Sequence, residues 1–139
     1  MPPGTIDSRL CDTEAMPSAA DALERLRVIC FALPEVTERL SHGSPSFFIR
    51  DKKVLCSFHP HEIHGEHGMS IWAPAPPGVQ EQLVEDEPER FYRPPYVGVR
   101  GWVGVRLDRD VDWAEIDGII RDSFRHVAPK TLVRQLDGS

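Results

Sequence analysis

The sequence predicts an α+β fold, in which an antiparallel β-sheet is packed on one face by helices from the two ends of the chain. Two observations support this prediction. Apolar residues recur at helical spacing near both ends, and the middle of the chain holds short β-favouring runs separated by Pro and Gly. With 139 residues the chain can build one core. We assign residues 17–139 to a single domain and residues 1–16 to a flexible lead-in.

The first helix is expected to begin at Ser18, because Ser18 is a favourable N-cap and Asp21 follows three residues later. Its buried face should consist of the apolar residues at helical spacing, which are Ala22, Leu26, Ile29, Cys30 and Leu33. Pro34 ends the helix, since proline cannot continue the hydrogen-bond ladder. Residues 35–40 are expected to form a short connector and residues 41–45 a turn.

Strands are expected next, as a meander with one helical insertion. Residues 46–50 and 54–59 flank Asp51-Lys52-Lys53, which predicts a β-hairpin with a basic tip. Alternation of strand side chains predicts one shared core face, made of Phe47, Ile49, Val54, Cys56 and Phe58. A polar loop at 60–68 leads to a third strand at 69–73.

The remaining helices are also predicted from capping residues and prolines at their termini. A short acidic helix is expected at 79–86, between a Pro-rich segment and Pro88. Asp112 and Glu115 form the capping pattern of a long helix. Its apolar stripe comprises Trp113, Ile116, Ile119, Ile120, Phe124 and Val127. Pro129 is placed to start a last helix, whose apolar residues are Leu132, Val133 and Leu136.

Residues 93–107 carry the most distinctive pattern in the chain. If residues 96–107 form one strand, one face is apolar, with Val97, Val99, Gly101, Val103, Val105 and Leu107. The other face then carries Tyr96, Gly98, Arg100, Trp102, Gly104 and Arg106. Glycine weakens a strand interior unless a bulge or a close approach requires it. The three glycines therefore indicate either room for large neighbouring side chains or a surface that faces a ligand.

Charge is distributed unevenly along the chain. The formal net charge of −6 argues against a generic nucleic-acid binder. Residues 74–92 contain five acidic residues and one arginine, whereas residues 93–106 contain three arginines and no acidic residue. A local basic strip is therefore expected on an acidic protein, and Lys52 and Lys53 would widen it if they lie beside it.

Other classes of protein are not favoured. The chain has no apolar run as long as the ~20 residues of a membrane span, and no signal-peptide pattern. Cys11, Cys30 and Cys56 lack CxxC spacing, which predicts reduced thiols and a cytoplasmic location. No GxSxG, HExxH, P-loop or GxGxxG motif is present, so a binding protein without a cofactor is favoured over an enzyme.

Histidines cluster within nine residues of the loop region, at His59, His61, His64 and His67. Imidazoles at this spacing can surround a divalent metal ion. The favoured interpretation is nevertheless a solvated loop with no physiological metal, because no second group of ligands is evident elsewhere.

Several short motifs together resemble the MmcQ/YjbR family over about residues 20–137. They are Leu33–Glu38, Ser44–Phe47, Pro88–Phe91, Pro94–Tyr96, Gly101–Asp108 and Val127–Lys130. The resemblance implies a CyaY-like fold and a "double wing" motif of the sheet that is commonly described as DNA-binding. Many members carry Asn-Lys and a His before the Trp, where this chain has Val99-Arg100-Gly101. Only the cation is matched, at Arg100.

Two kinds of function follow from these observations. The first is DNA binding through the sheet face and the hairpin tip. Tyr96, Arg100, Trp102 and Arg106 would form the platform, and Arg93, Lys52 and Lys53 would contact phosphates. The alternative is a non-catalytic module that binds a small anionic ligand, such as a nucleotide, or a protein partner.

Overall fold

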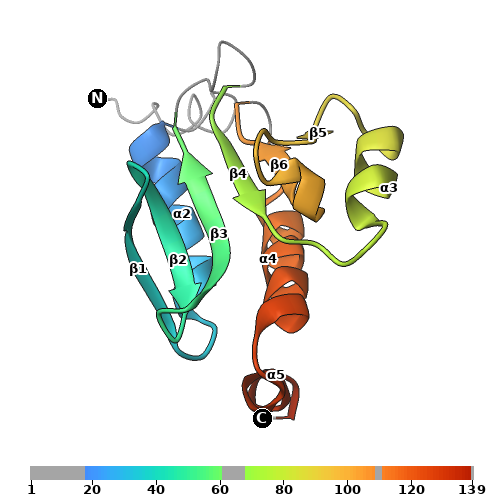
Figure 1. Cartoon of the computed structure of the whole chain (residues 1–139). Helices are drawn as coiled ribbons and strands as arrows, with labels where there is room; N and C mark the ends of the chain where they lie inside the picture. The colour runs from blue at the N-terminus through green and yellow to red at the C-terminus, as the bar shows by residue number, and fades with distance from the viewer. Residues whose placement is uncertain (1–17, 61–67, 109–110, 139) are drawn as a thin grey trace, which may run out of the picture.

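The computed structural model of the protein describes residues 18–60, 68–108 and 111–138 (Figure 1). Its elements in chain order are α2 (Ala19–Phe31), β1 (Val36–Ser41), β2 (Ser44–Ile49), β3 (Lys53–His59), β4 (Ser70–Ala73), α3 (Val79–Asp86), β5 (Phe91–Tyr92), the 3₁₀ helix η2 (Gly98–Arg100), β6 (Val103–Arg106), α4 (Trp113–Val127) and α5 (Lys130–Gly138). The predicted lead-in, residues 1–16, lies outside the described residues.

The strands form one six-stranded antiparallel sheet with the order β1-β2-β3-β4-β6-β5. The first four strands are a meander, of which β2, β3 and β4 correspond to the three predicted strands. After α3 the chain returns as β5 at the edge of the sheet, and β6 then fills the position between β4 and β5. The α+β class predicted from the sequence is confirmed.

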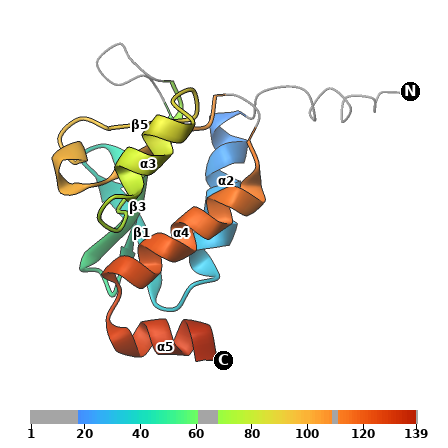
Figure 2. The ribbon, with the colours of Figure 1, turned by 90° about the vertical axis from the view of Figure 1, so that its right-hand side faces the viewer.

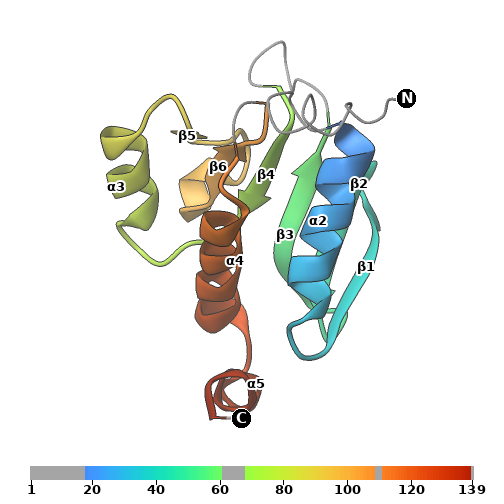
Figure 3. The ribbon, with the colours of Figure 1, turned by 180° about the vertical axis from the view of Figure 1, so that it is seen from behind.

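Helices α2 and α4 cover one face of the sheet (Figures 2 and 3). The main core lies between them and the sheet, and its largest fully buried side chains include Leu26, Phe47, Phe58, Ile120 and Phe124. Figure 1 shows the sheet from its other side, which we call the open face. Within the described ranges, none of the helices combines the length and apolar content needed to cross a bilayer.

The predicted N-caps are confirmed, whereas the first helix ends at Phe31, before the expected stop at Pro34. The Ser18 hydroxyl accepts a hydrogen bond from the backbone N–H of Asp21 at 3.1 Å and caps α2. Asp112 caps α4 by accepting from the backbone N–H groups of Ala114 and Glu115. Helix α3 spans the predicted residues, 79–86. Caps are readable from sequence because they satisfy helix donors with nearby side chains.

The expected connector at residues 35–40 is wrong, because residues 36–41 form the edge strand β1. This strand pairs along its whole length with β2, from Val36 opposite Ile49 to Ser41 opposite Ser44. None of its side chains is buried, and Leu40 has 71% of its surface accessible. An edge strand that buries so little apolar surface gives no alternating pattern to read.

The predicted core position of Val54 is also wrong. The pairing of β2 with β3 shifts between Phe47, which lies opposite Cys56, and Phe48, which lies opposite Val54. Leu55 is thus the extra residue of a β-bulge, and it is buried in the main core. The bulge reverses the alternation, so Val54 faces the open side while Cys56 and Phe58 stay in the core.

The conditional prediction of one strand over residues 96–107 fails. Tyr96 has a left-handed backbone (φ 67°), residues 98–100 form η2, and Gly101 again has a positive φ of 90°. Only Val103–Arg106 is a strand, and there the predicted parity holds, with Val103 and Val105 in the core. Leu107, just after the strand, also lies in the core as predicted. Before the strand the parity is lost, and the side chain of Val99 is 77% exposed.

Candidate ligand-binding pocket on the open sheet face

A small aromatic cluster, distinct from the main core, lies on the open face. It consists of Trp72 on β4, Tyr92 on β5 and Trp102 just before β6. The Tyr92 hydroxyl accepts a hydrogen bond from Trp72 Nε1 at 2.7 Å and shares another with Ser70 Oγ at 2.7 Å. Burial raises the pKa of Tyr92, so its hydroxyl is protonated at neutral pH.

Gly104 makes this cluster possible. A Cβ atom at this position would lie 2.5–2.8 Å from three atoms of the Tyr92 ring, which is too close for any real contact. Of the two reasons for strand glycines that the sequence left open, room for a large neighbouring side chain is therefore correct at Gly104. Gly98 is similar, because its Cβ would lie 2.5 Å from Arg93 Cγ.

His59 extends the aromatic cluster onto β3. Its imidazole stacks on Trp72 with ring centroids 3.7 Å apart. Both ring nitrogens are engaged, Nε2 with Ser57 Oγ at 2.9 Å and Nδ1 with Ser44 Oγ at 3.3 Å. Burial lowers the pKa of His59 to about 4, because desolvation disfavours the imidazolium. The imidazole is therefore neutral at physiological pH.

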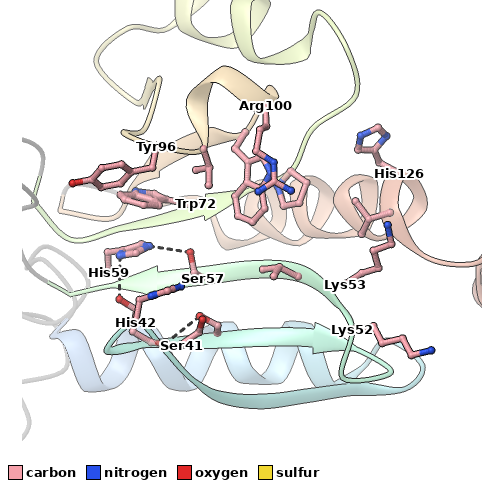
Figure 4. A pocket seen from close by; sticks show the side chains of 17 residues that line it. Ser41, His42, Lys52, Lys53, Ser57, His59, Trp72, Tyr96, Arg100 and His126 are labelled. Atoms are coloured by element: carbon pink, nitrogen blue, oxygen red, sulfur yellow. Dashed lines mark hydrogen bonds between the residues drawn. The ribbon is translucent and has the colours of Figure 1, made fainter.

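His59 and Trp72 line one end of a pocket with a volume of ≈860 Å³ (Figure 4). The pocket is lined from β1, β2 and β3 on one side and from the segment around η2 on the other. Gln80 of α3 fixes that segment, since its Nε2 donates to the carbonyl oxygens of Gly98 (2.8 Å) and Trp102 (2.5 Å). Arg100 lies between these two anchored residues.

The lining of the pocket is positively charged, unlike the protein as a whole. It includes Lys52, Lys53 and Arg100, and none of its 17 described residues is an aspartate or a glutamate. In the part of the chain that the structure describes, these three cations form no ion pair. The cations are therefore available to an anion from outside.

Figure 4 shows that the two ends of the pocket differ. Arg100 and Lys53 extend into it from opposite walls, and His126 of α4 lies at the same end. We call this the cationic end. Tyr96, Trp72, His59 and His42 lie at the other end, together with Ser57 and Ser41. We call this the neutral end.

Five of the seven residues predicted to bind a ligand line this pocket: Lys52, Lys53, Tyr96, Arg100 and Trp102. Of the three arginines of the basic strip, Arg100 lines the same pocket as Lys52 and Lys53. Arg93 and Arg106 are not among the lining residues. The side chain of Arg93 packs on Gly98, and the Arg106 guanidinium lies 5.6 Å from the centre of the Tyr92 ring.

Trp102 differs from the expected stacking platform in its exposure. Only 9% of its surface is accessible, and the Arg100 guanidinium lies 5.9 Å from its ring centre. Tyr96 is the opposite case, with 73% of its surface accessible at the rim of the pocket. Of the predicted aromatic pair, Tyr96 is the one that presents its ring to solvent.

Of the four clustered histidines, the structure describes only His59. His61, His64 and His67 lie outside the described residues. His59 is described, and its two nitrogens bond to serines as above. Among residues 18–60, 68–108 and 111–138, no group of three or more His, Cys, Asp or Glu side chains is arranged to hold a metal ion.

Sequence reasoning missed several contributors to the site. Trp72 and Ser57 were expected only as strand residues, His126 as part of a helix, and Gln80 as part of an acidic helix. Trp72 and Gln80 act through partners that are distant in sequence, such as the Tyr92 hydroxyl, which is 20 residues from Trp72. Ser57 bonds His59 two residues later on the same strand, a pairing that the spacing could have suggested. A lone polar or aromatic residue inside a short strand gives no local signal of such a partner.

The family model named YjbR matches residues 31–126. The chain belongs to the YjbR family. Its fold is similar to the crystal structure of Deinococcus radiodurans protein DR2400, described as a DUF419 domain, with 19% identity, 91% of each chain covered and a TM-score of 0.65. No curated protein matches the chain. The match to YjbR confirms the resemblance seen in the sequence, and the likeness to DR2400 shows the fold alone.

Proposed function

We propose that the protein binds nucleic acid, DNA in the first instance, through the pocket and the adjacent hairpin turn on the open sheet face. The observation that carries the proposal is the charge of the pocket. Among the residues that the structure describes, three cations without ion pairs and no carboxylate line it, on a chain with a net charge of −6. A protein that needed this face only for folding would have no reason to keep it free of the acids that are abundant elsewhere.

The overall acidity of the chain does not prevent such contacts. Charges separated by more than a Debye length of about 8 Å are largely screened at physiological salt. Phosphates bound at Lys52, Lys53 and Arg100 would therefore be controlled mainly by the local cations. Neutralised phosphates release counterions, so the affinity should fall steeply as salt rises.

A small anionic ligand, such as a nucleotide, is the second candidate. The shape of the site favours it, because a volume of ≈860 Å³ lies within the range of about 300–1,000 Å³ typical of small-molecule pockets. A flat nucleic-acid platform would not require such a hollow. Mononucleotides therefore belong in the same set of ligands as oligonucleotides.

The test measures fluorescence anisotropy of labelled single-stranded and duplex oligonucleotides at several salt concentrations. Arg100→Ala and Lys53→Ala should each weaken binding and reduce the slope of log K against log salt by about 1. The matched control is Arg25→Ala, which removes the same charge from α2, on the covered face of the sheet.

Three results would be informative. Loss of affinity in the two pocket variants but not in Arg25→Ala would support the proposal. Equal losses in all three would mean that only net charge matters. Binding of mononucleotides but of no oligonucleotide would replace the proposal by the second candidate.

A further inference from the structure

The neutral end of the pocket is chemically suited to an uncharged polar ring. Ser57 and His59 are hydrogen-bonded to each other, and Ser44 bonds the other imidazole nitrogen. A serine hydroxyl has one proton to donate and two lone pairs, so one bond to His59 leaves it able to bond a ligand. The low pKa of His59 keeps its imidazole uncharged at neutral pH.

The rim of the neutral end is formed by two side chains whose backbone lies in the left-handed region. Tyr96 has φ 67° and His42 has φ 53°, and both line the pocket. His42 belongs to the two-residue turn between β1 and β2, where a positive φ is ordinary, whereas a positive φ at a bulky residue such as Tyr96 is uncommon. The left-handed turn at Tyr96 presents an exposed aromatic ring beside Trp72 (Figure 4).

The cationic end of the pocket is suited to the phosphate group of a nucleotide. Arg100 is held by the flanking hydrogen bonds of Gln80, and Lys53 faces it from β3 (Figure 4). Paired cations of this kind suit a phosphate group. One pocket thus joins a site for an anion to a site for a polar, stackable ring.

We propose that the pocket holds one unpaired nucleotide of a nucleic-acid strand, with its base at the neutral end against Tyr96 and its phosphate between Lys53 and Arg100. The proposal rests on the nucleic-acid function proposed above and narrows it to single-stranded segments. In a duplex the bases are paired and stacked and show only their edges in the grooves. A base can reach the serines and His59 on the pocket floor only when it leaves the stack.

The experiment compares three ligands of equal length: a single strand, its duplex, and a strand in which every base is replaced by an abasic residue. The abasic strand keeps all phosphates and removes all stacking. The intact single strand should bind at least roughly tenfold more tightly than either of the others, given the typical strength of stacking on an aromatic side chain.

Two variants test the two ends separately. Tyr96→Ala should weaken binding of the intact strand and leave the abasic strand unchanged, whereas Lys53→Ala should weaken both by the same factor. Val99→Ala is the control for Tyr96→Ala, because Val99 is equally exposed in the same segment and does not line the pocket.

The outcomes distinguish the unpaired-nucleotide site from the more general proposal of nucleic-acid binding. Equal affinity for the three ligands would overturn the unpaired-nucleotide site and leave nucleic-acid binding intact. A Tyr96→Ala effect of the same size on the abasic strand would overturn the placement of the base. Failure of every oligonucleotide to bind at low salt would overturn both.

Discussion

The two faces of the sheet are built on different principles. The face covered by α2 and α4 is a continuous apolar core, with large side chains such as Phe58, Ile120 and Phe124 fully buried. The open face has a much smaller cluster of three aromatic residues. A hydrogen bond connects Tyr92 of this cluster to Ser70, and His59, which bonds two further serines, stacks on Trp72. The covered face supplies stability through burial. The open face uses its polar atoms to hold a hollow in a defined shape.

This difference separates stability from binding. Side chains on the covered face touch many neighbours, so their removal leaves cavities. The cations of the open face, such as Lys53 and Arg100, have no ion-pair partner in the described part of the chain. We therefore expect changes of stability to be concentrated on one face and changes of binding on the other.

The largest effect is expected from Phe124→Ala on the covered face. Phe124 is fully buried between α4 and the sheet, and truncation of such a residue costs about 3–5 kcal/mol. Urea denaturation would measure the loss, with Val99→Ala as an exposed control that should stay within about 0.5 kcal/mol. A loss below about 1 kcal/mol would contradict the core described above.

The next effect depends on pH and arises from the open face. The pKa of His59 is about 4 in the folded protein against 6.5 in an unfolded chain, so the unfolded state binds more protons between these values. Stability from this group is complete above pH 6.5 and is lost as the pH falls toward 4. The loss is at most about 3–4 kcal/mol, since one pKa unit corresponds to about 1.4 kcal/mol.

His59→Gln provides the comparison, because glutamine does not titrate. The free energy of unfolding should be measured for both proteins by urea denaturation from pH 4 to 7.5. The wild type should lose more stability than the variant over this interval. Parallel curves would show that His59 is not held neutral by burial.

An intermediate effect is expected for Gly104→Ala. The added methyl group would collide with the Tyr92 ring and overpack the aromatic cluster, at a cost of about 1–3 kcal/mol. Thermal or urea denaturation measures the change. Adding Tyr92→Leu should cost less in the Gly104→Ala background than in the wild type, because the smaller side chain relieves the collision. Additive effects would argue against a direct contact.

The smallest effect on stability is expected for Lys53→Ala. The side chain is exposed and forms no ion pair in the described residues, so the free energy of unfolding should change by less than about 0.5 kcal/mol. The same variant is expected to lose affinity for oligonucleotides. A marked destabilisation in urea would show that Lys53 supports the fold, and the contrast between the two faces would fail.

Much of the covered face could be predicted from the sequence. The apolar stripe of α4 and the N-caps Ser18 and Asp112 are local patterns, and each is set by residues a few positions apart. The core positions Phe47 and Phe58 also followed from simple alternation. These predictions succeeded because the physical cause lies within one helix or one strand.

The open face could be predicted only in part. Arg100 and Lys53 were selected for their charge, but their meeting in one pocket depends on a sheet order that no local pattern reveals. Val54 was misplaced by the bulge at Leu55, and the segment around Tyr96 was misjudged because its left-handed turn interrupts the expected strand. The positions of side chains on the open face are determined by non-local strand register and by irregular backbone.

The close contact of Gly104 with Tyr92 has a consequence for the history of the family. The two positions lie on adjacent strands, and the ring of one occupies the space that a side chain at the other would need. Substitutions at these positions should therefore be inherited together. A relative with a larger residue in place of Gly104 should carry a smaller one in place of Tyr92, and it should then lack the hydroxyl that bonds Trp72. Such relatives would form a branch with a differently shaped pocket.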